Sequence, residues 1–161
     1  MINNTEFRAM TYRIEHPRLG FIEAEKREWR VKQELSFACI RQSTSRVSII
    51  VPEAGDEPSI DQLQTVVDLM DASSSLREEI EEAIFKEFPL RIRPYYVPED
   101  MLEMLPEQRE PADVWKLITK LYSVWVDKDC VASLAFSVIF DEEHELKVHI
   151  EDGKVDFVSM G

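Results

Sequence analysis

The chain has 161 residues, of which 44% are hydrophobic and 32% charged, with a formal net charge of −13. These values exclude a disordered or fibrous chain and are typical of a protein with a packed core. No apolar run reaches the roughly 18 residues of a membrane span, and the polar start lacks the apolar segment of a signal peptide. We therefore expect one domain over residues 1–161, located in the cytoplasm, with no membrane partner.

Alternating apolar residues between positions 20 and 51 predict strands with one covered face. The apolar positions are Phe21, Trp29, Val31, Leu35, Phe37, Cys39, Val47, Ile49 and Val51. Turn-forming residues from Pro52 to Pro58 then end this pattern.

Two helices are expected next, each beginning with a capping box. Ser59 with Gln62 forms the first box and Ser75 with Glu78 the second, because a serine hydroxyl accepts from the third amide while the longer side chain reaches back. The second helix is expected to end at Pro89. Its outward face carries Glu78, Glu79, Glu81, Glu82, Lys86 and Glu87.

A proline-rich connection from Leu90 to Pro111 follows and contains Tyr95 and Tyr96. Connections of this length are often functional. A third helix is expected from Ala112 to about Leu121, with Pro111 in its first turn.

The last twenty-six residues predict two successive β-hairpins. Asp152-Gly153 between alternating apolar residues is a strong hairpin signal, because a type I′ turn needs positive φ at both central positions. The expected buried face comprises Leu134, Phe136, Val138, Leu146, Val148 and Ile150. Strands, then helices, then strands indicate an α+β fold, with a mainly antiparallel sheet from the N- and C-terminal hairpins and two or three helices on one face.

The negative charge is concentrated in the middle of the chain. Residues 1–52 carry nine Lys or Arg and six Asp or Glu, residues 53–113 carry five and seventeen, and residues 114–161 carry five and nine. This distribution disfavours nucleic acid and favours a basic protein partner. A solvated helical face that keeps the protein soluble is the alternative explanation.

The sequence contains no Gly-rich phosphate loop, no G-x-S-x-G elbow, no H-E-x-x-H and no paired C-x-x-C. We therefore expect no cofactor, no metal and no catalytic residue. Cys39 and Cys130 are expected to be buried free thiols, because the chain carries no export signal, and a single disulfide between them is the alternative. The tryptophans Trp29, Trp115 and Trp125 are expected in the core.

Asp141, Glu143 and His144 form the one dense set of titratable side chains beside a strand end. A carboxylate and an imidazole could bind a divalent cation, or the carboxylate could orient the ring for proton transfer. Contact with a partner is a second interpretation. A purely structural role in the turn is the third, since such groups commonly bond turn amides.

The segment from Phe140 to Val155, with Phe140-Asp141-Glu142-Glu143-His144 and Asp152-Gly153-Lys154-Val155, resembles the ending of a group of small bacterial proteins of unknown function. Some of these proteins are similar to immunity proteins of toxin systems. The earlier His16-Pro17 pair, Gly20 and Trp29 fit the same outline. Glu145 stands where a glycine often follows the histidine. The resemblance implies no catalytic residue and no cofactor.

These observations favour a non-enzymatic, protein-binding domain, in one form an immunity-type protein that masks a basic partner. The expected partner-binding residues are Glu78, Glu82, Glu87, Tyr95, Tyr96, Asp141, Glu143 and His144. A small metal-dependent hydrolase at Asp141, Glu143 and His144 is the enzymatic alternative, and a homo-oligomeric structural module is the third. The sequence leaves the oligomeric state open.

Overall fold

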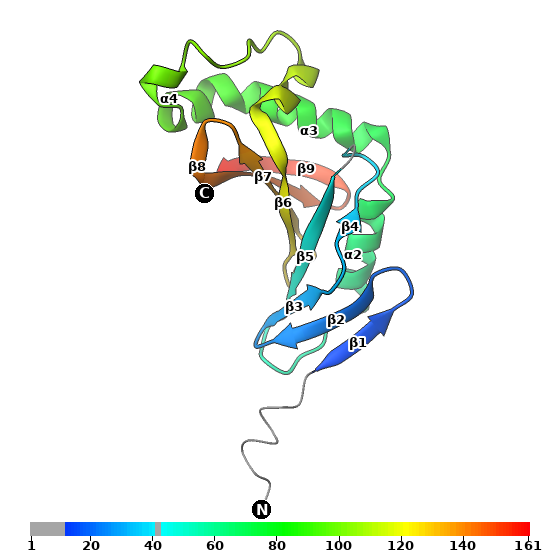
Figure 1. Cartoon of the computed structure of the whole chain (residues 1–161). Helices are drawn as coiled ribbons and strands as arrows, with labels where there is room; N and C mark the ends of the chain where they lie inside the picture. Colours follow the sequence, from blue (N-terminus) through cyan, green and yellow to red (C-terminus); the bar gives the residue numbers. More distant parts are fainter. Residues whose placement is uncertain (1–11, 41–42) are drawn as a thin grey trace, which may run out of the picture.

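The computed structural model describes residues 12–40 and 43–161, and the polar start of the chain lies outside this part (Figure 1). The described residues form one nine-stranded sheet, with helices packed on one face. No helix in this part of the chain is long and apolar enough to cross a membrane.

The sheet follows the order β1-β2-β3-β5-β6-β7-β8-β9, with β4 paired to β5 outside this path. The first strands are β1 (Arg13–His16), β2 (Gly20–Glu25), β3 (Glu28–Val31), β4 (Leu35–Ser36) and β5 (Thr44–Ile50). The last strands are β6 (Ile118–Val126), β7 (Ala132–Val138), β8 (Asp141–Glu151) and β9 (Lys154–Met160). All neighbours are antiparallel except β5 and β6. The expected α+β fold with a mainly antiparallel sheet is confirmed.

The parallel pair of β5 and β6 joins the two halves of the sheet and requires a long crossover connection. This connection contains all the described helices, beginning with α2 (Ile60–Met70). The capping box of Ser59 and Gln62 is confirmed. The Gln62 side-chain amide also donates to the carbonyl oxygens of Ile50 and Asp127, each at 2.8 Å, and so holds α2 to the ends of both parallel strands.

The prediction of a second capping box at Ser75 and Glu78 is wrong. Helix α3 (Ser74–Glu87) has Ser73 as its N-cap residue, and no side chain caps the helix. The Ser73 hydroxyl instead lies 2.7 Å from that of Ser75. Two serines that precede the expected start compete for the cap position, and the sequence alone does not decide between them.

The helical path also continues past Pro89. A π-helical turn, η1 (Phe88–Ile92), and a short helix, α4 (Arg93–Tyr96), follow α3 directly. Pro89 lies in the first turn of η1, where its fixed φ suits a helical backbone. The connection then contains a 3-10 turn, η2 (Glu99–Met101).

The third expected helix is shorter than predicted and of a different type. It is a 3-10 helix, η3 (Pro111–Leu117), and β6 begins directly after it. Leu121 pairs with Phe136 of β7. Pairing with β7 therefore overrides the helical spacing of this segment, while the position of Pro111 in the first turn is confirmed.

The C-terminal hairpins and their buried face are confirmed. Leu134, Phe136, Val138, Leu146, Val148 and Ile150 are all at most 5% exposed. Asp152 and Gly153 have φ values of 52° and 76°, as a type I′ turn requires. The first hairpin differs in detail, because its turn is at Ile139 and Phe140, and Asp141 already pairs with Val138 as the first residue of β8.

Three expectations about burial need correction. Trp29 is buried and Trp115 partly buried, but Trp125 is 38% exposed because its position in β6 faces away from the helices. Both cysteines are free; Cys39 is buried, and Cys130 is only partly buried in a turn with a φ of 62°. Glu81, expected on the outer face of α3, is buried.

Candidate functional site

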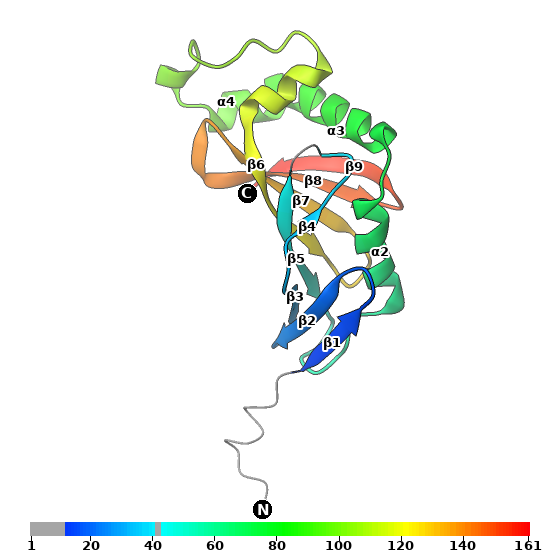
Figure 2. The ribbon, with the colours of Figure 1, turned by 45° about the vertical axis from the view of Figure 1, so that its right-hand side comes forward.

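One flank of α3 faces β9 across an open groove of about 400 Å³. The α3–β9 groove is lined by Glu79, Glu82, Ala83, Glu87, Asp156 and Val158, among others. Spacings of three and four residues place the helical members of this set on one side of α3. In Figures 1 and 2, β9 runs beside α3 along the length of the helix.

Three of the four carboxylates that line the α3–β9 groove make no ion pair within the described part of the chain. Glu79, Glu82 and Asp156 have no ion-pair partner among the residues that the structure describes. Glu87 is paired, since its Oε2 lies 3.2 Å from Nε of Arg91. Lys86 and Arg91 also line the groove, so four carboxylates stand against two cations and the groove presents net negative charge to an approaching molecule.

The groove also exposes an unpaired strand edge. Glu145 and Gly161 exchange both of their backbone hydrogen bonds, at 3.3 and 3.1 Å. Because hydrogen-bonded and non-bonded pairs alternate in an antiparallel ladder, Val158 and Met160 direct their N–H and C=O groups away from β8. No hydrogen bond to these groups occurs within residues 12–40 and 43–161. Such an edge can pair with another extended chain.

The expected helical carboxylates do not all belong to this groove. Glu82 and Glu87 line it, whereas Glu78 is exposed on α3 outside it. Asp156 and Glu79 belong to the groove but were not among the expected binding residues. Glu79 was expected only on the outward face of the second helix, and the position of β9 beside α3 is what brings Asp156 to it.

The structure brings the tyrosine segment to the start of β8. Tyr96 packs edge-on against His144, with ring centroids 5.7 Å apart and an angle of 66° between the rings. Tyr95 is 78% exposed. Two expected binding segments that are distant in the sequence therefore form one surface, which no sequence pattern indicated.

Asp141 organises the backbone at this surface. Its Oδ1 accepts from the amides of Glu143 and His144, at 2.9 and 3.0 Å, and its Oδ2 lies 2.8 Å from Nδ1 of His144. Desolvation alone would raise the pKa of Asp141, but the two amide bonds and the His144 ring outweigh it and lower that pKa below its usual value. Asp141 is thus engaged, while the exposed Glu143 side chain makes no bond to either residue.

No group of three His, Cys, Asp or Glu side chains among the described residues is arranged to hold a metal ion. His149, the other histidine near the C-terminus, lies away from His144 on the face of the sheet opposite the helices. The structure therefore brings Asp141, His144 and Tyr96 together, and leaves Glu143 and His149 apart from them.

The open face of the sheet carries a row of residues that the sequence interpretation missed. Cross-strand register aligns Ser48, Trp125, Ser133, His149 and Phe157 across five strands. The His149 ring is hydrogen-bonded through both nitrogens, to Ser133 at 2.9 Å and to Ser159 at 3.0 Å. It also stacks on Phe157, with centroids 4.1 Å apart.

Desolvation, and then the nearby Lys147 charge, lower the pKa of His149, so the ring is neutral at pH 7. Alternation in β6 to β9 could have placed these residues opposite the buried face. It could not show that Trp125 and Phe157 of this row stay exposed.

Comparison with known protein families gives one match. Residues 19–160 match the family described as "Domain of unknown function (DUF6985)". The chain belongs to the DUF6985 family. No curated protein and no solved structure matches the chain significantly. Membership of DUF6985 agrees with the expectation of an uncharacterised family and assigns no residue a role.

Proposed function

We propose that this DUF6985 protein is a non-enzymatic protein-binding domain whose α3–β9 groove receives an extended, basic segment of a partner. One observation carries the proposal: the unpaired edge of β9 lies beside the same groove that Glu79, Glu82 and Asp156 line, and these three carboxylates make no ion pair within the described residues. A strand edge supplies main-chain hydrogen bonds, and charge beside it selects the side chains of the added strand.

Charge and aromatic groups contribute differently to such a complex. The carboxylates raise the association rate by attracting a basic partner, and aromatic residues slow dissociation by burying area. Tyr95 is the exposed aromatic residue of the surface formed with Tyr96 and His144. We propose this surface as the second contact of the same partner.

An immunity-type role, in which the domain masks a basic partner inside a bacterial cell, is the specific form of this function that we favour. It is supported by the net charge of −13 and by the resemblance carried by residues 140–155. The hydrolase alternative has less support, because the Asp141 carboxylate is already engaged by two amides and by His144.

A synthetic peptide tests the proposed pairing with β9. The probe is an eight-residue peptide that alternates lysine and valine, titrated into the protein and followed by the NMR shifts of the β9 amides. Two N-methylated forms are compared, one methylated on the lysine amides and one on the valine amides. Because only one set of amides can face β9, we expect one form to bind like the parent and the other to lose binding.

Variants of the helix supply the control. The double variant Glu79→Gln and Glu82→Gln should lower the affinity of the protein for the peptide. Glu78 lies outside the groove on the same helix, so Glu78→Gln should leave that affinity unchanged. Equal binding of the two methylated forms would show that the peptide is held by charge alone. No saturable shift of the β9 amides with the parent peptide would refute binding in this groove.

A further inference from the structure

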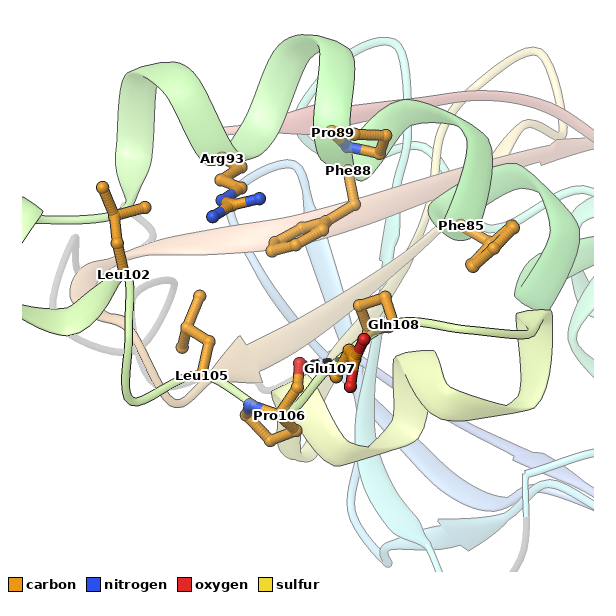
Figure 3. Close-up of a pocket in the computed structure, with 9 residues that line it drawn as sticks. All are labelled: Phe85, Phe88, Pro89, Arg93, Leu102, Leu105, Pro106, Glu107 and Gln108. Atoms are coloured by element: carbon orange, nitrogen blue, oxygen red, sulfur yellow. Dashed lines mark hydrogen bonds between the residues drawn. The ribbon is translucent and has the colours of Figure 1, made fainter.

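A second hollow, of about 350 Å³, lies on the other flank of the segment from α3 to α4 (Figure 3). The connection between Val97 and Glu110 forms its opposite wall. We call it the Arg93 pocket, and its main lining residues are Phe85, Phe88, Arg93, Leu102, Leu105 and Gln108. Figure 3 shows the Phe88 and Leu105 side chains directed toward each other across the hollow. Its size is within the range of small-molecule sites.

The pocket offers one unpaired cation. Arg93 makes no ion pair or side-chain hydrogen bond within the described residues. Glu107 supplies the one carboxylate among the lining residues, and Nη2 of Arg109 already pairs with it at 2.9 Å. The guanidinium of Arg93 is therefore available to an anion.

The pocket lining also contains an unsatisfied acceptor. The Gln108 side-chain nitrogen donates to the carbonyl oxygens of Pro106 and Asp113, at 3.2 and 3.1 Å. Its Oε1 is buried and accepts no hydrogen bond. Because this oxygen is closed to solvent, it takes no part in binding, and Arg93 is the polar group that the pocket presents to a bound molecule.

We propose that the Arg93 pocket binds a small carboxylate with an apolar body. The carboxylate pairs with the planar guanidinium of Arg93, which binds such groups through two parallel hydrogen bonds. The apolar body lies between the aromatic wall of α3 and η1 and the leucines of the connection. This site is independent of the α3–β9 groove, because it uses the opposite side of the helical segment.

The test uses 4-phenylbutanoate as the probe and 4-phenylbutan-1-ol, which keeps the ring and chain but lacks the charge, as its control. Binding is measured by NMR shifts of the amides from Phe85 to Gln108 in the full chain. We expect the carboxylate to bind about threefold to fivefold more tightly than the alcohol, because Arg93 is exposed and an exposed charged pair contributes a modest factor.

Two arginine variants distinguish the site from general attraction. Arg93→Gln should remove the preference for the carboxylate and leave the alcohol unchanged. Arg91→Gln is the matched control, since Arg91 is an exposed arginine two residues away that pairs with Glu87 in the other groove. Equal affinity for the two probes, a preference that survives Arg93→Gln, or no saturable shift at 10 mM probe would each overturn the proposal.

Discussion

Glu81 and Glu82 are adjacent in the sequence, but α3 directs their side chains into opposite surroundings. Glu81 is buried and accepts from Nε1 of Trp115 at 2.6 Å and from Nε of Arg77 at 2.9 Å. Glu82 lines the α3–β9 groove and has no ion-pair partner among the described residues. The charge of a helix therefore does not show which of its carboxylates are free to meet a partner.

The two flanks of α3 differ in the same way. The flank of Glu81 is connected to the core, because Trp115 packs edge-on against Phe136 with ring centroids 5.8 Å apart. The flank of Glu82 borders the edge of the sheet. We infer that the part of the first flank around Glu81 serves stability and that the second flank serves binding of the protein partner, and the changes below test this division.

The largest expected effect is in the core under the first flank. Phe136→Ala should lower the free energy of unfolding by about 3 to 5 kcal/mol, through lost burial and the cavity that remains. Urea unfolding measures the change. Phe157→Ala is the control, because Phe157 is 52% exposed. A loss below about 1 kcal/mol for Phe136→Ala would contradict its place in the core.

Glu81 and Glu82 compare the two flanks directly. Glu81→Gln should lower the free energy of unfolding by about 1 to 3 kcal/mol, because it replaces charged hydrogen bonds to Arg77 and Trp115. Glu82→Gln should change it by no more than about 0.5 kcal/mol. Equal effects of the two changes in urea unfolding would remove the distinction between the flanks.

Much of the fold could be predicted because local signals agreed with the final structure. Asp152-Gly153 fixed a tight turn, and the apolar alternation on both sides of it gave the buried face. The capping box at Ser59 likewise depends only on residues within one turn. These features form through neighbours in the sequence, so a single sequence contains them.

The remaining features depend on contacts between distant segments. The parallel pairing of β5 with β6 leaves no local signal, and pairing with β7 converts the segment from Ile118 to Leu121 from expected helix to strand. The same limit applies to the site. The contact of Tyr96 with His144 and the position of Asp156 beside α3 follow from tertiary packing alone.

Asp141 and Glu143 repeat the contrast between an engaged and a free carboxylate. The folded-state pKa of Asp141 is lowered, so its contribution to stability is present above the unfolded value of about 3.9 and is lost as pH falls through the folded value. Asp141→Asn should therefore reduce stability most at pH 7, with the difference from the unmodified protein shrinking below pH 4. Glu143→Gln is the matched control, because the Glu143 side chain makes no bond to Asp141 or His144; a similar loss of stability in both variants at pH 7 would contradict the assignment.

Zinc binding tests whether this turn is more than structural. With the Asp141 carboxylate engaged and Glu143 apart from it, a stable site would lack the three or four ligands that Zn²⁺ usually requires. Calorimetry should show no specific binding. Micromolar affinity that disappears in His144→Ala would favour the metal-dependent hydrolase over the binding domain.

Amide hydrogen exchange along β9 tests the central claim most directly. In the free protein, the amides of Val158 and Met160 should exchange fast because they point to the open edge, whereas those of Phe157 and Ser159 should be protected by β8. At saturating concentration, the peptide that alternates lysine and valine should slow exchange of the Val158 and Met160 amides and leave exchange of the Phe157 and Ser159 amides unchanged. Val158 and Met160 amides that stay unprotected in the complex would contradict strand addition at β9.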